Sequence, residues 1–153
     1  MSNTEIIASL GLILSLITAI IGIYKFLDAR KRELKWKRTE FVFEQAKYLD
    51  NDKEIILALA VLCKTDSNYK IESIFSTDGK FIDGVEHSYM IGFEKLLNLL
   101  DRLVYAYRAD VITKGEFENF GMYLEQVLNN TRVSKYADAN GYADVVTVAG
   151  ELA

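Results

Sequence analysis

Residues that could carry enzyme chemistry are sparse in this chain. Its one cysteine, Cys63, stands inside an apolar run, and its one histidine is His87. A zinc site needs three or four His, Cys or carboxylate ligands, and no such cluster occurs around either residue. An apolar surrounding also disfavours the thiolate that a Cys–His pair would need. We therefore predict a protein that is not an enzyme and that holds no metal and no cofactor.

Two other signatures of catalysis are absent from the sequence. The glycines that could cradle a phosphate stand singly and form no glycine-rich loop: Gly79, Gly84, Gly92 and Gly115. Acidic pairs such as Asp83 and Glu86 match the solvated starts of helices, so we do not interpret them as catalytic carboxylates.

One group of residues has the composition of a ligand site. Guanidinium groups and aromatic faces are what a site for a phosphate-bearing nucleotide would use. The candidates are Arg102, Tyr105, Arg108, Lys135 and Tyr136. The first three are expected on a helix face that points away from a leucine-rich face, and the last two near the break before the final helices. A solvated, charged helix face would explain the same residues, so both interpretations stay open.

The element that comes first in the chain is an uncharged run of nineteen residues, Ile6 to Tyr24. At about 1.5 Å per residue, a helix of this length nearly covers the roughly 30 Å hydrocarbon core of a bilayer. We disfavour a cleaved signal peptide, because the preceding MSNTE is acidic and no small-residue cleavage site follows. A buried helix of a soluble protein is the other alternative. The sequence predicts a transmembrane anchor over residues 1–27.

Basic residues crowd one side of this run and set the expected orientation. Seven Lys or Arg and two acidic residues lie between positions 25 and 38, whereas no Lys or Arg precedes the run. Basic residues are retained on the cytoplasmic side, so we expect the N-terminus outside the inner (cytoplasmic) membrane and residues 28–153 inside. A basic helix over residues 28–49 should contact anionic lipid. The interface residues are Lys25, Arg30, Lys31, Arg32, Lys35, Trp36, Lys37 and Arg38.

The rest of the chain is acidic. Residues 39–153 carry eleven Lys or Arg and nineteen Asp or Glu, which outweighs the basic segment and gives the whole chain a net charge of -4. Affinity for the phosphates of nucleic acids comes mainly from Lys and Arg. We therefore expect no general nucleic-acid binding.

Two stripes could mediate association between copies of the chain. Small residues recur every four positions in the anchor, which lets helices approach closely in lipid. Apolar residues then continue at a spacing of seven where most neighbours are charged, but the second seam of such a heptad is polar (Lys31, Arg38, Gln45), unlike a conventional coiled coil. The stripe residues are Gly11, Ser15, Ala19, Leu27, Leu34 and Phe41. Homo-oligomerisation and packing on the protein's own domain both stay open.

Residues 50–153 are expected to form a cytoplasmic, mainly α-helical domain with one minor β-hairpin. The run EIILALAVLC is apolar all round and predicts a helix buried at the domain centre. A long helix is expected from Val85 to the break at residues 110–113, where Thr113 and Glu116 form a capping box for the next helix. Two short helices should flank Asn140-Gly141. The Asp78-Gly79 pair, with short apolar runs on both sides, predicts the hairpin.

The layout resembles that of small prokaryotic membrane-anchored helical effectors of CRISPR antiviral systems. The segments that carry the resemblance are an uncharged span followed by KFLDARKRELKWKRTEF, DNDKEIILALAVL and EKLLNLLDRL. One kind accompanies RNA-targeting type VI-B systems and is related to HEPN domains, and another, in type III systems, is gated by a cyclic oligoadenylate. HEPN ribonucleases use an Arg-x4–6-His pair, and His87 has no such arginine before it, so the resemblance does not imply ribonuclease activity.

This resemblance implies a homo-oligomer that perturbs or perforates the inner membrane when its cytoplasmic domain is activated. Its expected partners are the lipid bilayer and either a cyclic oligoadenylate or a CRISPR effector complex. The alternative is an anchored scaffold that recruits a soluble partner and forms no pore.

Overall fold

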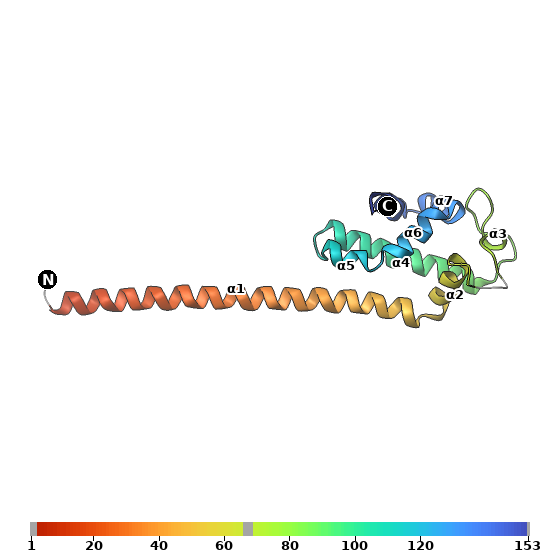
Figure 1. The fold of residues 1–153 in the computed structure, drawn as a ribbon. Coiled ribbons are helices and arrows are strands. Elements are labelled where there is room, and N and C mark those ends of the chain that lie inside the picture. The colour runs from red at the N-terminus through yellow and green to blue at the C-terminus, as the bar shows by residue number, and fades with distance from the viewer. Residues whose placement is uncertain (1–2, 66–68, 153) are drawn as a thin grey trace. The chain divides into compact units, whose positions relative to one another are not determined.

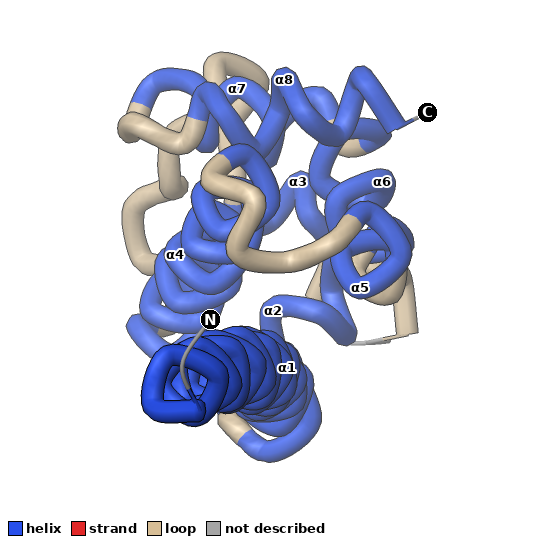
Figure 2. The backbone as a smooth tube through the Cα atoms, turned by 90° about the vertical axis from the view of Figure 1, so that its left-hand side faces the viewer, coloured by secondary structure: helices blue, strands red, loops and turns tan. Residues whose placement is uncertain are grey.

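The computed structural model describes residues 3–65 and 69–152, and this part of the chain is mainly helical (Figure 1). Its eight helices are α1 (Asn3–Asn51), α2 (Lys53–Leu62), α3 (Ile71–Ile74), α4 (His87–Arg108), α5 (Lys114–Glu118), α6 (Gly121–Asn129), α7 (Thr131–Ala139) and α8 (Ala143–Leu152). Figure 2 shows helix and loop but no strand in the described ranges. The predicted α-helical class is confirmed.

By its internal contacts the chain divides into two units, Met1–Glu40 and Phe41–Ala153. The described part of the first unit is a stretch of α1 alone, and the second holds the last turns of α1 together with α2 to α8. The predicted boundaries after residues 27 and 49 lie inside α1, so that division by function stays a prediction.

Helix α1 continues without interruption to Asn51. Its part from Asp28 to Tyr48 contains neither Gly nor Pro, the two residues that most disfavour a helix. It ends at Asn51, one residue before a strong start signal. Asp52 has an extended backbone (ψ 116°), and its Oδ1 accepts hydrogen bonds from the N–H groups of Glu54 and Ile55, both at 3.1 Å. This is the geometry of a helix N-cap, so Asp52 ends one helix and begins α2.

Helix α2 packs one face against α4, and Gly92 of α4 is where the two backbones come closest. A Cβ added at Gly92 would lie 2.1 Å from the carbonyl oxygen of Glu54, so only glycine fits. The opposite face of α2 is open to solvent, since Ile56 is 44% exposed. The predicted burial is therefore confirmed for the face that carries Ile55, Ala58, Val61 and Leu62 and is wrong at Ile56.

Helix α4 supplies the centre of the core. Its leucine-rich face is fully buried, as predicted, at Phe93, Leu96, Leu97, Leu100, Leu103 and Val104. The predicted capping box is also confirmed, because Glu116 Oε2 accepts from the Thr113 N–H at 2.7 Å and Thr113 Oγ1 accepts from the Glu116 N–H at 3.4 Å. One continuous helix was expected from this capping box to about Asn129. A turn at Asn119–Phe120 instead divides it into α5 and α6. Gly141, at φ +92°, separates α7 from α8 as predicted.

The predicted β-hairpin is wrong. Its first strand is replaced by the helical turn α3, because Ile71 and Ile74 both turn into the core at a spacing of three. The Ser73 hydroxyl stabilises this turn by accepting from the Lys70 N–H at 3.3 Å. A single antiparallel bridge, between Phe75 and Phe81, is the only β-pairing in the described ranges.

The loop between these two phenylalanines is closed by two backbone hydrogen bonds, from the Ser76 N–H to the Lys80 carbonyl and from the Ile82 N–H to the Ile74 carbonyl, and it is also tied to α7. Gly79 has φ +80°, and a Cβ there would lie 2.7 Å from the backbone nitrogen of Tyr136. Arg132 Nη1 donates to the Phe75 carbonyl at 2.6 Å, and Lys135 Nζ donates to the Thr77 carbonyl at 3.0 Å. Contacts that are far apart in the sequence therefore set the shape of this segment.

We expect Gly92→Ala to lower the free energy of unfolding by about 1–3 kcal/mol, the usual cost of forcing extra atoms into a packed core. Chemical denaturation of the full-length protein in detergent, followed by circular dichroism, measures this loss. Gly115→Ala is the matched control, because nothing lies within 4 Å of a Cβ at that position. Equal stability of the two variants would contradict the close approach of α2 and α4.

Candidate functional site

The apolar part of α1 has no partner in the structure. Every large apolar side chain from Leu10 to Leu27 is exposed, at positions that span several helical turns. In the part of the chain that the structure describes, α1 is the one helix long and apolar enough to cross a membrane. Water is a poor solvent for such a surface, so this segment is compatible with a membrane anchor.

The polar side chains inside this apolar segment are satisfied within the helix. Ser15 Oγ donates to the Gly11 carbonyl and Thr18 Oγ1 to the Leu14 carbonyl, both at 2.9 Å. A Cβ at Gly11 would meet nothing within 4 Å, and Leu27 and Leu34 of the second stripe are exposed. The two stripes are therefore open in a single copy of the chain, with the exception of Phe41, which packs against the core of the second unit.

The basic segment presents its charges along the surface of α1. Apart from Arg38, which is half-buried, its predicted interface residues are exposed, and Trp36 is 70% exposed. Ion pairs within the helix take up part of the charge: Arg30 and Lys37 with Glu33, and Arg32 with Asp28. A hydrogen bond from Lys37, and then the charges of Lys37 and Arg30, lower the pKa of Glu33.

Three cations of this segment, Lys25, Lys31 and Lys35, have no ion-pair partner in the described ranges. Exposed pairs on a helix contribute little to stability, and these three lysines leave positive charge at the surface of the segment.

The five residues predicted to bind a ligand do not share one hollow. Arg108 pairs with Asp144 of α8, and Tyr105 is 74% exposed to solvent. Lys135 holds the loop at Thr77, as described above, and Tyr136 is buried beside the same loop. Of the five, Arg102 lines a hollow with residues from α1. Lys135 and Tyr136 thus have structural contacts that explain their positions.

Tyr136 is a hydrogen-bond donor inside the core. Its hydroxyl donates to Glu94 Oε1 at 3.4 Å, and its ring packs on Phe75 and Phe81 with centroids 5.3 and 4.7 Å away. Burial, followed by the charge of Glu94, raises the pKa of Tyr136 to about 12. The phenol therefore stays neutral at physiological pH and has no role as a base.

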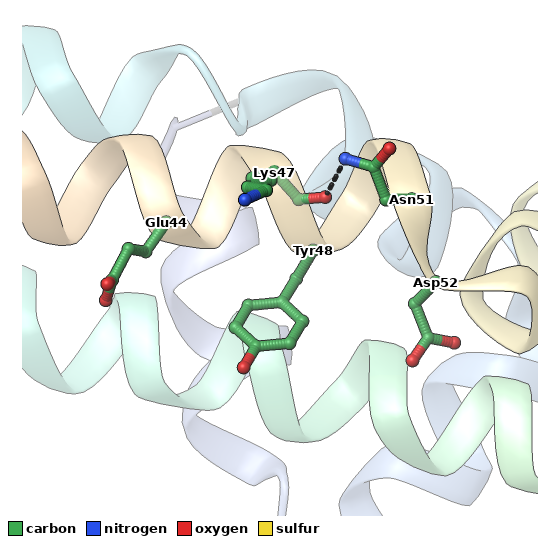
Figure 3. Close-up of a pocket in the computed structure, with 5 residues that line it drawn as sticks. All are labelled: Glu44, Lys47, Tyr48, Asn51 and Asp52. Carbon is green, nitrogen blue, oxygen red and sulfur yellow. Dashed lines mark hydrogen bonds between the residues drawn. The ribbon is translucent and has the colours of Figure 1, made fainter.

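The hollow at Arg102 was not predicted. It lies between the last turns of α1 and helix α4, with a volume of about 230 Å³, and is lined by Gln45, Tyr48, Asp52, Ile55, Lys95, Asn98, Leu99 and Arg102. A second hollow of about 430 Å³ adjoins it, because Tyr48 and Asp52 line both. Figure 3 shows Glu44, Tyr48 and Asp52 on one side of α1, with Asn51 turned back to donate to the Lys47 carbonyl at 2.8 Å.

Gln45 is the polar residue that the core of this region buries. Phe41, Ala46 and Leu49 of the same helix pack on the core, and Gln45 between them is 6% exposed. This break in an apolar helical face was visible in the sequence as a single glutamine among Phe41, Val42, Ala46 and Leu49. In the sequence, Gln45 stands out only as a polar residue of the second heptad seam.

Lys95 closes one end of the hollow. Its Nζ lies 2.8 Å from Asp52 Oδ2 and 3.2 Å from Glu54 Oε2, so one cation joins the start of α2 to α4. The hydrogen bond from Lys95 lowers the pKa of Asp52, and the same bridge raises the pKa of Lys95.

The residues with metal-binding side chains lie apart in the described ranges. These residues contain no group of three or more His, Cys, Asp or Glu side chains placed to hold a metal ion. Cys63 is the half-buried C-cap of α2, and His87 is exposed at the first position of α4.

Comparisons with protein families, with curated proteins and with solved structures find no match for this chain.

We expect the Lys95 bridge to give stability a specific pH dependence. Asp52 has a lowered pKa when folded, so its contribution is present above the ordinary value of about 3.9 and is lost as pH falls through the lower folded value. Lys95 has a raised pKa, so its contribution is present below about 10.4 and is lost as pH rises through the higher folded value. Denaturation midpoints of the full-length protein, measured across this pH range, should therefore fall both at acid pH and at alkaline pH.

Asp52→Asn removes the negative charge that pairs with Lys95 but keeps a side chain that can cap α2. Asparagine caps helices about as well as aspartate, so the stability of this variant should depend much less on pH in the acid range and change little otherwise. Asp52→Ala should lower the free energy of unfolding by about 1 kcal/mol more, because it also removes the cap. If Asp52→Asn lost stability at acid pH as the wild type does, the bridge between Asp52 and Lys95 would not contribute to stability.

Proposed function

We propose that this protein is a membrane-anchored, non-enzymatic adaptor. Residues 1–27 would hold it in the inner membrane, and its C-terminal helical domain would recruit a soluble partner to the membrane surface. The observation that carries this proposal is the fully exposed apolar surface from Leu10 to Leu27, which is directly continued by a basic segment. No soluble role would favour the exposure of so many large apolar side chains.

The proposed orientation places the N-terminus outside and the domain in the cytoplasm. It is supported by the seven Lys and Arg between positions 25 and 38, all of which follow the apolar segment. Lys25, Lys31 and Lys35 are available for anionic lipid, each with a contribution of about 1 kcal/mol, and Trp36 is exposed among them. The positively charged segment would then mark the inner surface of the membrane.

Recruitment without catalysis is supported by the chemistry of the domain. Its single cysteine ends α2 and its single histidine begins α4. The described residues contain no group of three or more His, Cys, Asp or Glu side chains that could hold a metal ion. Acid–base catalysis would need a titratable group near neutral pH inside a cleft. The residues at the hollow beside Tyr48 are suited to binding instead.

A membrane-perforating effector is the second candidate. It is supported by the stripe of Gly11, Ser15 and Ala19, which is free to pack against other copies. We rank it second because an aqueous pore needs polar groups along its wall. The hydroxyls of Ser15 and Thr18 donate to carbonyls of their own helix, and no charged residue lies between Ile6 and Tyr24.

We expect Leu16→Arg to remove the protein from the membrane fraction of expressing cells. An arginine near the centre of a membrane helix costs about 2.5–3.5 kcal/mol of insertion free energy. Leu34→Arg, which places the same charge in the basic segment, is the control and should leave the protein in the membrane. Fractionation followed by carbonate extraction distinguishes the two, and a soluble, well-behaved wild-type protein would refute the anchor.

Dye release from liposomes separates the adaptor from the effector. We expect full-length protein, reconstituted at increasing ratios of protein to lipid, to release no trapped dye, because its anchor offers no polar wall. Release that grows steeply with this ratio and disappears in Gly11→Leu would support the effector and contradict the adaptor.

A further inference from the structure

The hollow between α1 and α4 contains polar groups that the protein itself does not use. Gln45 is 6% exposed, and its side-chain amide has no hydrogen-bond partner among the described residues. Neither its nitrogen nor its oxygen is fully enclosed by the protein, so the amide keeps contact with the space of the hollow and can exchange water for a bound molecule. Gln45 lines the hollow, where a bound molecule could satisfy it.

Two further groups of the same hollow are free in the described ranges. Arg102 forms neither an ion pair nor a hydrogen bond there, and the hydroxyl of Tyr48 has no partner. Asn98 is partly occupied, since its Nδ2 donates to the Glu94 carbonyl at 2.8 Å. A guanidinium, a carboxamide and a phenol therefore face one space, and together they offer mainly hydrogen-bond donors.

The charges around the hollow leave Arg102 as the cation that is not neutralised. Asp52 and Glu54 share Lys95, and Asp52 also accepts from two backbone N–H groups at the start of α2. Glu44 is a lining residue of the adjoining hollow and not of this one. Ile55 and Leu99 supply the apolar part of the wall, and the side chains of Arg102 and Tyr48 remain accessible from solvent.

We infer that this hollow binds the oxyanion of a small molecule, either a carboxylate or a phosphate. Arg102 would bind two oxygens through its planar fork, while the amide of Gln45 and the hydroxyl of Tyr48 would donate to the remaining lone pairs. The adjoining hollow beside Glu44 and Lys47 would hold the rest of the molecule. This inference does not depend on the adaptor function, because an anchored protein of either class could carry such a site.

The chain offers a sharp test, because it contains only two glutamines, Gln45 and Gln126. Full-length protein labelled with ¹⁵N-glutamine in zwitterionic nanodiscs gives two side-chain amide signals, one at the hollow and one remote from it. We expect sodium phosphate or sodium acetate to shift the Gln45 signal in a saturable way and to leave the Gln126 signal in place. The two salts are separate arms, and whichever shifts Gln45 at lower concentration identifies the oxyanion.

Two variants on the same helix serve as test and matched control. Arg102→Met keeps a long side chain without the charge and should weaken binding about tenfold or more, since hydrogen bonds to a charged group contribute about 1.5–3 kcal/mol. Arg108→Met removes an arginine that pairs with Asp144 and should leave the affinity unchanged. Tyr48→Phe should weaken binding to a smaller extent, because only one donor is lost.

Several outcomes would overturn the inference. They are an unmoved Gln45 signal with both salts, an equal shift of Gln126, an equal shift with sodium chloride, or undiminished binding by Arg102→Met. Retention of both glutamine signals in each variant shows that the domain is still folded, so a loss of binding cannot be attributed to unfolding.

Discussion

The close approach of α2 to α4 at Gly92 is the contact from which the candidate site follows. With no side chain at Gly92, the carbonyl of Glu54 can reach the surface of α4. Lys95 lies one helical turn further along and therefore meets both Asp52 and Glu54. Asp52 joins the end of α1 to the start of α2, and this places Gln45 and Tyr48 of α1 beside the next two turns of α4. The hollow thus exists because two backbones can nearly touch.

Helix α1 belongs to two environments, and its composition changes accordingly. Between Leu10 and Leu27 it is apolar on all sides and has no protein against it, which suits a bilayer because lipid is as apolar as the side chains. Between Phe41 and Leu49 it has one buried face, which packs on the core of the C-terminal domain. In the proposed arrangement, the basic residues between these two parts lie where the surroundings change from lipid to water. A single element with no break in its sequence therefore carries both proposed tasks, anchoring and ligand binding.

The starts and ends of helices could be predicted because local chemistry decides them. Asp52, Thr113 and Gly141 act through their own backbone neighbours, within a few residues. The hairpin prediction failed because its outcome depends on distant residues. Asp78-Gly79 does form a turn, and the backbone pairs across it at Ile74 and Ser76, but Arg132 and Lys135 of α7 also bind the carbonyls of Phe75 and Thr77. For the same reason the five predicted ligand residues do not share one hollow, since Lys135 and Tyr136 contact that loop.

The sequence by itself determined the helical class, the long apolar segment and the charge asymmetry that follows it, because these are sums over neighbouring residues. It also showed Arg102 as a cation of interest, without its surroundings. Only the tertiary structure decided that Arg102 faces Gln45 and Tyr48, whereas Arg108 faces Asp144. Two arginines six residues apart on one helix point to different neighbours, and the packing of α1 and α8 on α4 determines which of them stays unpaired.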